Sequence, residues 1–305
     1  MELLKLLESI RTPFLDALIS GITYLGAEML FMIVALAFFW CVDKHRGYYL
    51  LFTGFCGTVC IQFLKMMFRV PRPWVLDPNF TIVESARAEA TGYSFPSGHT
   101  QIAVNLYGGI ARSSKRSAVQ VGGVVLFLLI AFSRMYLGVH TPKDVLVSLV
   151  IGTAFVLVIY PIMERARTNP RIMYGIIACA FLLALGNLLY VELWQFPTDV
   201  DAVNLTNAKE VAWKLFAAVV GICLIYPTDQ KYIHFETHAI WWAQILKVAG
   251  GLAVIVLIKS LLKTPLNALF GASIGGFVRY LIMVLTAGLL WPLSFRFFAR
   301  LGKKL

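Results

Sequence analysis

VLVSLVIGTAFVLVIYPIM, residues 145 to 163, is a continuous apolar run without a charged side chain, and it indicates the class of this protein. Similar runs recur along the 305 residues, of which 59% are hydrophobic and only 14% are charged. A soluble domain needs more polar residues to cover its surface. A helix of about 17 to 25 apolar residues has the length needed to cross a bilayer. The sequence therefore predicts a polytopic membrane protein.

The apolar runs are continuous rather than alternating in polarity, which favours spanning helices over a β-barrel. Residues 2–24 mix apolar and charged side chains and suit an interfacial helix. The polar, proline-containing segment 164–171 is predicted to separate a core, residues 1–165, from an accessory transmembrane region, residues 166–305. The predicted spans are 27–42, 48–68, 99–112, 118–137, 143–163, 173–190, 210–226, 239–262 and 267–295.

Lysine and arginine gather in alternate loops, and cytoplasmic loops carry the excess of these residues. The basic set comprises Lys44, Arg46, Arg112, Lys115, Arg116, Arg165, Arg167, Arg171, Arg296, Arg300, Lys303 and Lys304. We therefore expect a cytoplasmic C-terminus, with segments 69–98 and 138–142 on the opposite face. The net charge of +11 is explained by topology and by site residues, so nucleic acid is not an expected partner.

Three polar clusters interrupt the core: KMMFRVPRP at 65–73, PSGH at 96–99 and SRMYLGVHTPKD at 133–144. Each lies at the outward end of a predicted helix, so the topology brings all three to one face. Together they supply three cations, two histidines, one carboxylate and two helix N-termini. Arginine and lysine side chains and free N–H groups at helix N-termini suit phosphate oxygens. Because charges near a bilayer are costly, this constellation predicts a phosphate site.

The patterns K-x6-R-P, P-S-G-H and S-R-x5-H-x3-D, in this order, resemble the three signature motifs of the type-2 phosphatidic acid phosphatase family. The match is complete at the motif positions. The resemblance implies an all-α, polytopic membrane helical bundle with a six-helix phosphatase core, to which about four accessory transmembrane helices are added. The superfamily also includes vanadium-dependent haloperoxidases and sugar-phosphate phosphatases, so the motifs specify phosphate chemistry better than the substrate.

By motif position, the resemblance implies that His140 attacks phosphorus and forms a phosphohistidine. Asp144 would hold the ring of His140, and His99 would protonate the leaving oxygen and then activate water. This scheme requires no metal and no cofactor. The residues that the resemblance assigns to the phosphate oxygens are Lys65, Arg72, Ser97, Gly98 and Arg134.

Each of these residues also has an ordinary structural explanation when it is taken alone. Asp144 and Ser97 suit helix caps, and Arg72 suits a cation that snorkels at a helix end. Order and spacing together favour the catalytic interpretation. His234 and His238 are spaced i, i+4, but Glu236 is misplaced for a zinc motif.

Two further cations, Lys247 and Arg279, fall inside accessory spans. Intramembrane cations are usually paired or functional, so we weigh pairing within the bundle against a lipid-headgroup or regulatory role. Gly271 and Gly275 permit close helix packing.

The expected function is hydrolysis of a lipid phosphate monoester or lipid pyrophosphate at the extracytoplasmic face of a bacterial-type cell membrane. The alternatives are a phosphatase of a soluble sugar phosphate and a non-enzymatic lipid-phosphate transporter or scaffold. The expected partners are the lipid substrate and the bilayer, and the oligomeric state is open. The sequence does not name the lipid: polyprenyl pyrophosphate, phosphatidylglycerol phosphate, phosphatidate and sphingoid-base phosphate remain open.

Overall fold

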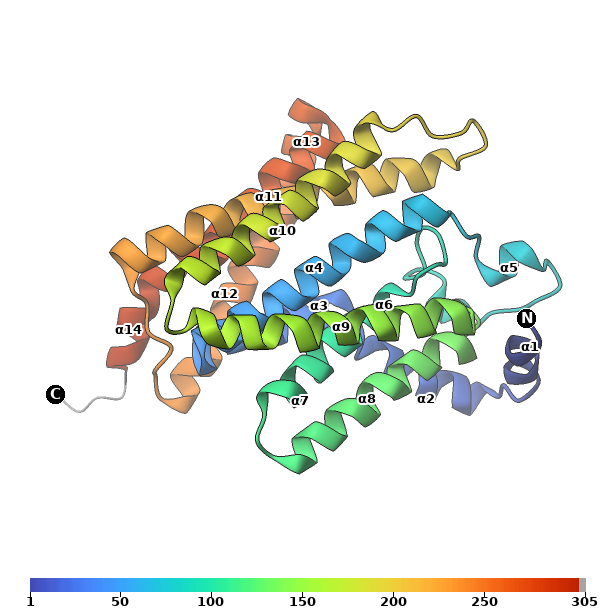
Figure 1. Ribbon diagram of the computed structural model, residues 1–305, viewed down its shortest axis with the longest axis horizontal. Helices are drawn as coiled ribbons and strands as arrows, with labels where there is room; N and C mark the ends of the chain where they lie inside the picture. Colours follow the sequence, from blue (N-terminus) through green and yellow to red (C-terminus); the bar gives the residue numbers. More distant parts are fainter. Residues whose placement is uncertain (302–305) are drawn as a thin grey trace. The chain divides into compact units, whose positions relative to one another are not determined.

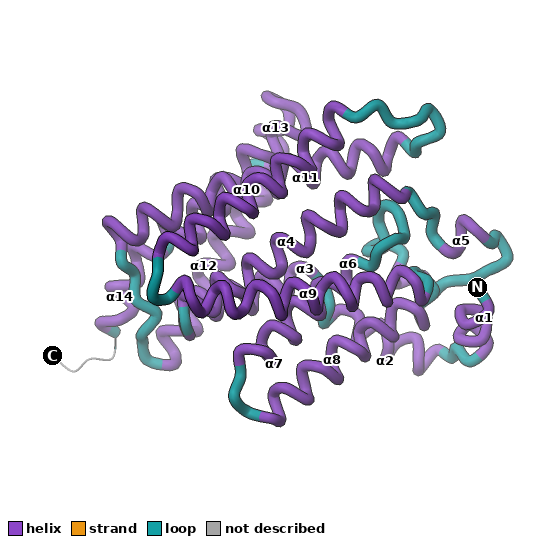
Figure 2. Tube along the Cα trace, in the orientation of Figure 1, coloured by secondary structure: helices purple, strands orange, loops and turns teal. Residues whose placement is uncertain are grey.

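The computed structural model describes residues 1–301, and this part of the chain contains helices and no strands (Figures 1 and 2). The predicted all-α fold is thereby confirmed. The helices are α1 (Glu2–Ser9), α2 (Pro13–Tyr24), α3 (Glu28–Ala37), α4 (Lys44–Phe68), α5 (Pro73–Leu76), α6 (Gly98–Ala103), α7 (Gly109–Ser113), α8 (Ser117–Tyr136), α9 (Pro142–Ala166), α10 (Pro170–Leu193), α11 (Ala202–Thr228), α12 (Trp241–Leu261), α13 (Lys263–Leu285) and α14 (Phe295–Arg300).

Within residues 1–301, seven helical segments are long and apolar enough to cross a bilayer. They are Lys44–Leu76, Ser117–Tyr136, Pro142–Ala166, Pro170–Leu193, Ala202–Ile233, Trp241–Leu261 and Lys263–Arg300. A bent pair, Pro13–Tyr24 with Glu28–Val42, adds an eighth when it is counted as one span. The protein is a multi-pass membrane protein.

Two predicted spans differ from the structure in detail. The span predicted at 99–112 contains a π-helical segment at Val104–Gly108 between α6 and α7, and it is not among the seven. The span predicted at 267–295 is interrupted at Gly271, whose φ of 76° and ψ of 171° are not helical. Glycine adopts a positive φ without the steric penalty that a Cβ imposes, so the apolar pattern continues while the helix breaks.

The described chain divides into two compact units. Unit 1 comprises Met1–Met32, Tyr49–Glu164 and Gln195–Ala208. Unit 2 comprises Ile33–Tyr48, Arg165–Trp194 and the described residues from Lys209 onward. Each unit thus draws on segments that are far apart in the sequence. The assignment of residues 1–165 to a core and 166–305 to an accessory region remains a prediction.

Buried hydrogen bonds connect the helices of unit 1. Asn105, in the π-helical segment after α6, donates from Nδ2 to the carbonyl oxygen of Thr53 on α4 at 2.6 Å. The hydroxyl of Tyr49 on α4 donates to the carbonyl oxygen of Val156 on α9 at 3.0 Å. Buried polar groups are costly unless they are paired, so these contacts fix α4 against its neighbours.

Caps set the beginnings of the helices that carry the motifs. Ser97 accepts a hydrogen bond from the backbone N–H of Thr100 at the start of α6. At the start of α9, the backbone N–H of Thr141 donates to Asp144 Oδ2 at 2.8 Å, and the N–H of Asp144 approaches Thr141 Oγ1 at 3.4 Å. Asp144 and Ser97 therefore do cap helices, as their ordinary explanation predicts, and this role leaves them available to the site.

Candidate active site

Arg72, between α4 and α5, connects the loop before α6 to the turn between α8 and α9. Its Nε donates to the carbonyl oxygen of Gly92 at 3.0 Å, and its Nη2 donates to that of Thr91 at 2.8 Å. Its Nη1 donates to the carbonyl oxygen of Val139 at 2.9 Å and lies 3.0 Å from Nε2 of His140. Figure 2 shows both loops at one end of the helices of unit 1. Only a guanidinium offers this many fixed donors.

His140 is 2% exposed. Because an arginine only donates, the contact with Arg72 assigns the lone pair of His140 to Nε2 and its proton to Nδ1. Burial, followed by the positive charges of Arg72 and Arg134, lowers the pKa of His140 well below its usual value of 6.5. The lowered pKa favours the neutral form of the ring.

Asp144 lies on the Nδ1 side of the His140 ring. Its Oδ2 lies 3.5 Å from Nδ1 of His140, a distance longer than a normal hydrogen bond. The same oxygen accepts from the hydroxyl of Ser94 at 2.6 Å and from the backbone N–H of Thr141 at 2.8 Å. The carboxylate is thus fixed by two donors and is placed to accept the Nδ1 proton after a small movement of the ring.

Two buried cations complete the site. Lys65, in the last turn of α4, donates to the carbonyl oxygen of Tyr93. Arg134, near the end of α8, is fully buried, and its Nη1 donates to Thr23 Oγ1 at 2.8 Å. Its Nε and Nη2 have no hydrogen-bond partner among residues 1–301. A buried guanidinium with two free donors needs an anion, because an uncompensated buried charge is strongly destabilising.

The PSGH motif lies at the start of α6. Ser97 Oγ is an acceptor for Thr100, so its own hydroxyl proton remains available to a phosphate oxygen. Apart from its chain neighbours, Gly98 has no atom within 4 Å of the position that a Cβ would occupy, so there is open space beside it.

His99 Nε2 lies 2.8 Å from Oε2 of Glu89, and the two side chains are 15% and 36% exposed. His99 is therefore the more accessible of the two motif histidines, as a general acid that meets the leaving group must be.

All eight predicted residues lie in unit 1. His140 lies between Arg72, at 3.0 Å, and Asp144, at 3.5 Å, and Lys65, Arg134 and His99 are near enough to act electrostatically on His140. Sequence reasoning missed Ser94, Thr23 and Glu89. Ser94 lies between the first two motifs, and no local pattern indicates its contact with Asp144.

His234 and His238 belong to no group of three histidine, cysteine or acidic side chains in residues 1–301 that could hold a metal ion.

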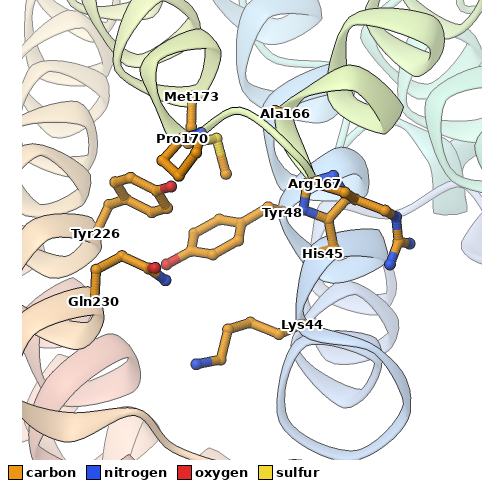
Figure 3. A pocket seen from close by; sticks show the side chains of 9 residues that line it. All are labelled: Lys44, His45, Tyr48, Ala166, Arg167, Pro170, Met173, Tyr226 and Gln230. Carbon is orange, nitrogen blue, oxygen red and sulfur yellow. The ribbon is translucent and has the colours of Figure 1, made fainter.

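A pocket lies wholly within unit 2 and contains none of the motif residues. It is a pocket of about 160 Å³ in which Tyr48 extends from α4 toward Tyr226 and Gln230 (Figure 3). Two lining cations are already paired inside the protein: Lys44 Nζ lies 2.7 Å from Asp229, and Arg167 lies 3.1 Å from Asp43. The remaining lining residues are His45, Ala166, Pro170 and Met173.

Comparison with known proteins gives a family assignment to both halves of the chain. Residues 46–168 match the PAP2 superfamily, and residues 213–304 match the transmembrane extension of PAP2 superfamily phosphatases. The first match contains all three motifs. No solved structure matches the chain.

Three curated relatives are similar to part of the chain. A probable sphingosine-1-phosphate phosphatase of Dictyostelium discoideum is 30% identical over 169 residues, which are 50% of this chain and 39% of the relative. Phosphatidylglycerophosphatase B of Bacillus subtilis is 29% identical over 158 residues, 47% of this chain and 72% of the relative. The undecaprenyl-diphosphatase BcrC of the same organism is 36% identical over 100 residues, which are 33% of this chain and 49% of the relative.

These alignments thus reach between 39% and 72% of the relatives' lengths, and none covers more than 50% of this chain. Two models of this superfamily match successive parts of the chain, so the chain belongs to the PAP2 superfamily, as a PAP2 domain followed by the PAP2 transmembrane extension.

Proposed function

We propose that this protein is a membrane phosphatase that hydrolyses a lipid phosphate monoester or lipid pyrophosphate through a phosphohistidine on His140. The observation that carries the proposal is the neutral, buried ring of His140 beside two free guanidinium donors of Arg134. A nucleophile with an adjacent unpaired cation suits an anionic electrophile.

In the first step, the substrate phosphate accepts hydrogen bonds from Arg134 and draws Arg72 Nη1 away from Nε2 of His140. Nε2 then attacks phosphorus, an N–P bond forms, and the bond from phosphorus to the leaving oxygen breaks. Burial, followed by the charges of Arg134 and Arg72, lowers the pKa of His99 to about 3 in the phosphate-free protein, so His99 gains its proton together with the arriving phosphate, whose negative charge offsets these cations. The leaving oxygen then takes this proton from His99, while Asp144 stabilises the charged ring of His140.

In the second step, water attacks the phosphohistidine. His99, now unprotonated, accepts a proton from the water, the N–P bond breaks, and inorganic phosphate leaves with neutral His140 restored. Lys65, Arg72 and Arg134 stabilise the charge on the equatorial oxygens in both transition states, where such contacts are most valuable.

Three observations favour a lipid over a soluble substrate. The site stands at the ends of membrane-spanning helices, the chain carries a transmembrane extension, and the three relatives are all named as phosphatases of phosphorylated lipids. The same proposal places the site at the extracytoplasmic face, because the loops of the opposite set hold the excess of lysine and arginine.

The test is phosphate release by the purified protein in detergent with a chelator present. The substrates are polyprenyl pyrophosphate, phosphatidylglycerol phosphate, phosphatidate, sphingosine 1-phosphate and a sugar phosphate. We expect release from at least one lipid, and none by His140→Ala. The exposed Arg171→Ala serves as the control outside the site. Equal release by wild type and His140→Ala would overturn the histidine mechanism, and release from the sugar phosphate alone would overturn the lipid class.

A rapid-quench experiment with a substrate whose phosphate is radioactively labelled tests the intermediate itself. We expect an acid-labile, alkali-stable label on wild type and no label on His140→Ala. A label that survives acid would indicate a different nucleophile. For orientation, reporter fusions at the C-terminus are expected to report a cytoplasmic position.

A further inference from the structure

Arg279 is a buried cation in α13, outside the phosphatase site and within the transmembrane extension. Its side chain is 6% exposed. Its Nε and Nη1 are buried and have no hydrogen-bond partner among residues 1–301. The aromatic ring near its guanidinium is that of its chain neighbour Tyr280, at 6.0 Å. An arginine does not lose its proton in a protein, so the buried charge of Arg279 persists and requires an anion.

Four lysines of unit 2, in contrast, have partners within the chain. Lys44 pairs with Asp229 at 2.7 Å, Lys209 with Glu192 at 3.0 Å and Lys214 with Glu210 at 3.1 Å. Lys247 donates to the carbonyl oxygen of Thr237 at 2.9 Å, so for Lys247 pairing within the bundle is the outcome.

The carboxylates of unit 2 offer Arg279 no partner. Asp229, Glu192 and Glu210 are paired as above, and Asp43 is 3.1 Å from Arg167. Glu236 is exposed in the loop before α12. Nε and Nη1 of Arg279 thus find no counter-charge among the described carboxylates of unit 2.

The helix around Arg279 is broken two turns before this residue, at Gly271. A Cβ on Gly276, one turn before Arg279 in α13, would lie 3.4 Å from Cε of Lys214, so this lysine, which is paired with Glu210, packs against the same stretch of helix. Helical side chains lean toward the N-terminus of their helix, which directs Arg279 toward Gly276 and the break at Gly271. In membrane proteins, broken helices occur where protein or a polar ligand satisfies them.

Arg134 supplies an internal comparison. Arg134 and Arg279 are the two arginines in residues 1–301 with two buried, unpartnered guanidinium nitrogens. Arg134 belongs to the proposed phosphate site, whereas Arg279 lies within the candidate span Lys263–Arg300. An arginine in a membrane span can extend along its helix toward the interface, where the phosphates of the bilayer lipids are the anions within its reach.

We propose that Arg279 binds the phosphate group of an anionic membrane phospholipid as a second site that is separate from catalysis. The phosphate pairs with Nε and Nη1 of Arg279, and this lipid holds the broken helix α13 in place. The inference does not depend on the proposed phosphatase activity.

The experiment compares wild type with Arg279→Met, which keeps most of the side-chain length and removes the charge. Thermal unfolding is followed in neutral detergent alone, and with added phosphatidylglycerol, phosphatidylcholine or inorganic phosphate. Phosphatidylglycerol carries a phosphodiester and so differs from the monoester and pyrophosphate substrates. Arg171→Met, an exposed arginine of the same unit, is the matched control.

We expect phosphatidylglycerol to raise the Tm of wild type and Arg171→Met by several degrees, and not that of Arg279→Met. Without lipid, Arg279→Met should be at least as stable as wild type, because it removes an uncompensated buried charge. Native mass spectrometry should detect one phosphatidylglycerol fewer on the variant.

A lower Tm of Arg279→Met without lipid, with an unchanged response to phosphatidylglycerol, would overturn the proposal and indicate a partner within the chain. A Tm rise with inorganic phosphate that is lost in Arg279→Met would identify a free anion instead of a lipid. Conversion of a dimer to a monomer by the substitution would identify a second copy as the source of the counter-charge.

Discussion

Nη1 of Arg72 stands 3.0 Å from Nε2 of His140, so the arginine that fixes the site also occupies the lone pair of the expected nucleophile. A phosphate that competes for this guanidinium frees Nε2 at the moment when phosphorus arrives. The nucleophile is thereby coupled to the presence of its substrate. The four predictions below follow from this relationship and from the contacts around it.

Arg72→Lys should lower kcat/KM by roughly 10²- to 10³-fold, the range seen when one fixed donor to a developing anion is removed. A lysine ammonium cannot reproduce four contacts in fixed directions. The measurement is steady-state phosphate release. Arg69→Lys, three residues earlier, is the matched control and should retain wild-type rates; equal losses in both variants would contradict a specific role for Arg72.

Ser94→Ala should lower kcat by about 10- to 100-fold, because it removes a hydrogen bond to a buried carboxylate that is worth about 1.5–3 kcal/mol. Ser148→Ala offers a close comparison, since the Ser148 hydroxyl donates to the backbone carbonyl of the same Asp144 at 2.9 Å. We expect kcat to be near wild type in Ser148→Ala. Comparable kcat values for both alanine variants would argue that Ser94 does not position Asp144.

Stability should depend on pH through His140. Its pKa is lowered in the folded protein by burial and by Arg72, so below about pH 6.5 the unfolded chain binds the proton and the folded chain does not. Acidification therefore destabilises the phosphate-free protein, by at most about 1.4 kcal/mol per pH unit. Unfolding at pH 7.5 and at pH 5.5 should show wild type losing more stability than His140→Asn. Parallel losses would mean that the pKa of His140 is not lowered.

Gly138→Ala should lower both stability and kcat. Gly138 precedes the His140 turn with a φ of 79°, and a Cβ there would lie 2.8 Å from Nη2 of Arg11 and 2.9 Å from the ring of Phe80. Strain of this kind is worth about 1–3 kcal/mol. Gly122→Ala, in α8 with nothing within 4 Å of the added carbon, should be neutral or stabilising. The comparison requires melting curves and kinetics of both variants.

The sequence by itself determined the membrane class, most helix limits and the motif residues. Apolar runs specify spans because no backbone polar group can remain unpaired in hydrocarbon, and a single helix meets that requirement locally. A spanning helix at 145–163 can therefore be predicted without knowledge of its neighbours, and α9 covers this segment as Pro142–Ala166. The motif cations and histidines are conspicuous for the same reason, because they interrupt such runs.

Only the tertiary structure decided which side chains meet. Ser94 contacts Asp144 across 50 positions and Thr23 contacts Arg134 across 111, and no periodicity encodes either pair. The break at Gly271 and the unpaired charge of Arg279 were equally out of reach, because a glycine in an apolar run and a cation in a span each fit several structures. Hydrophobicity is a property of each segment, whereas a hydrogen bond between distant residues requires the folded chain to bring two segments together.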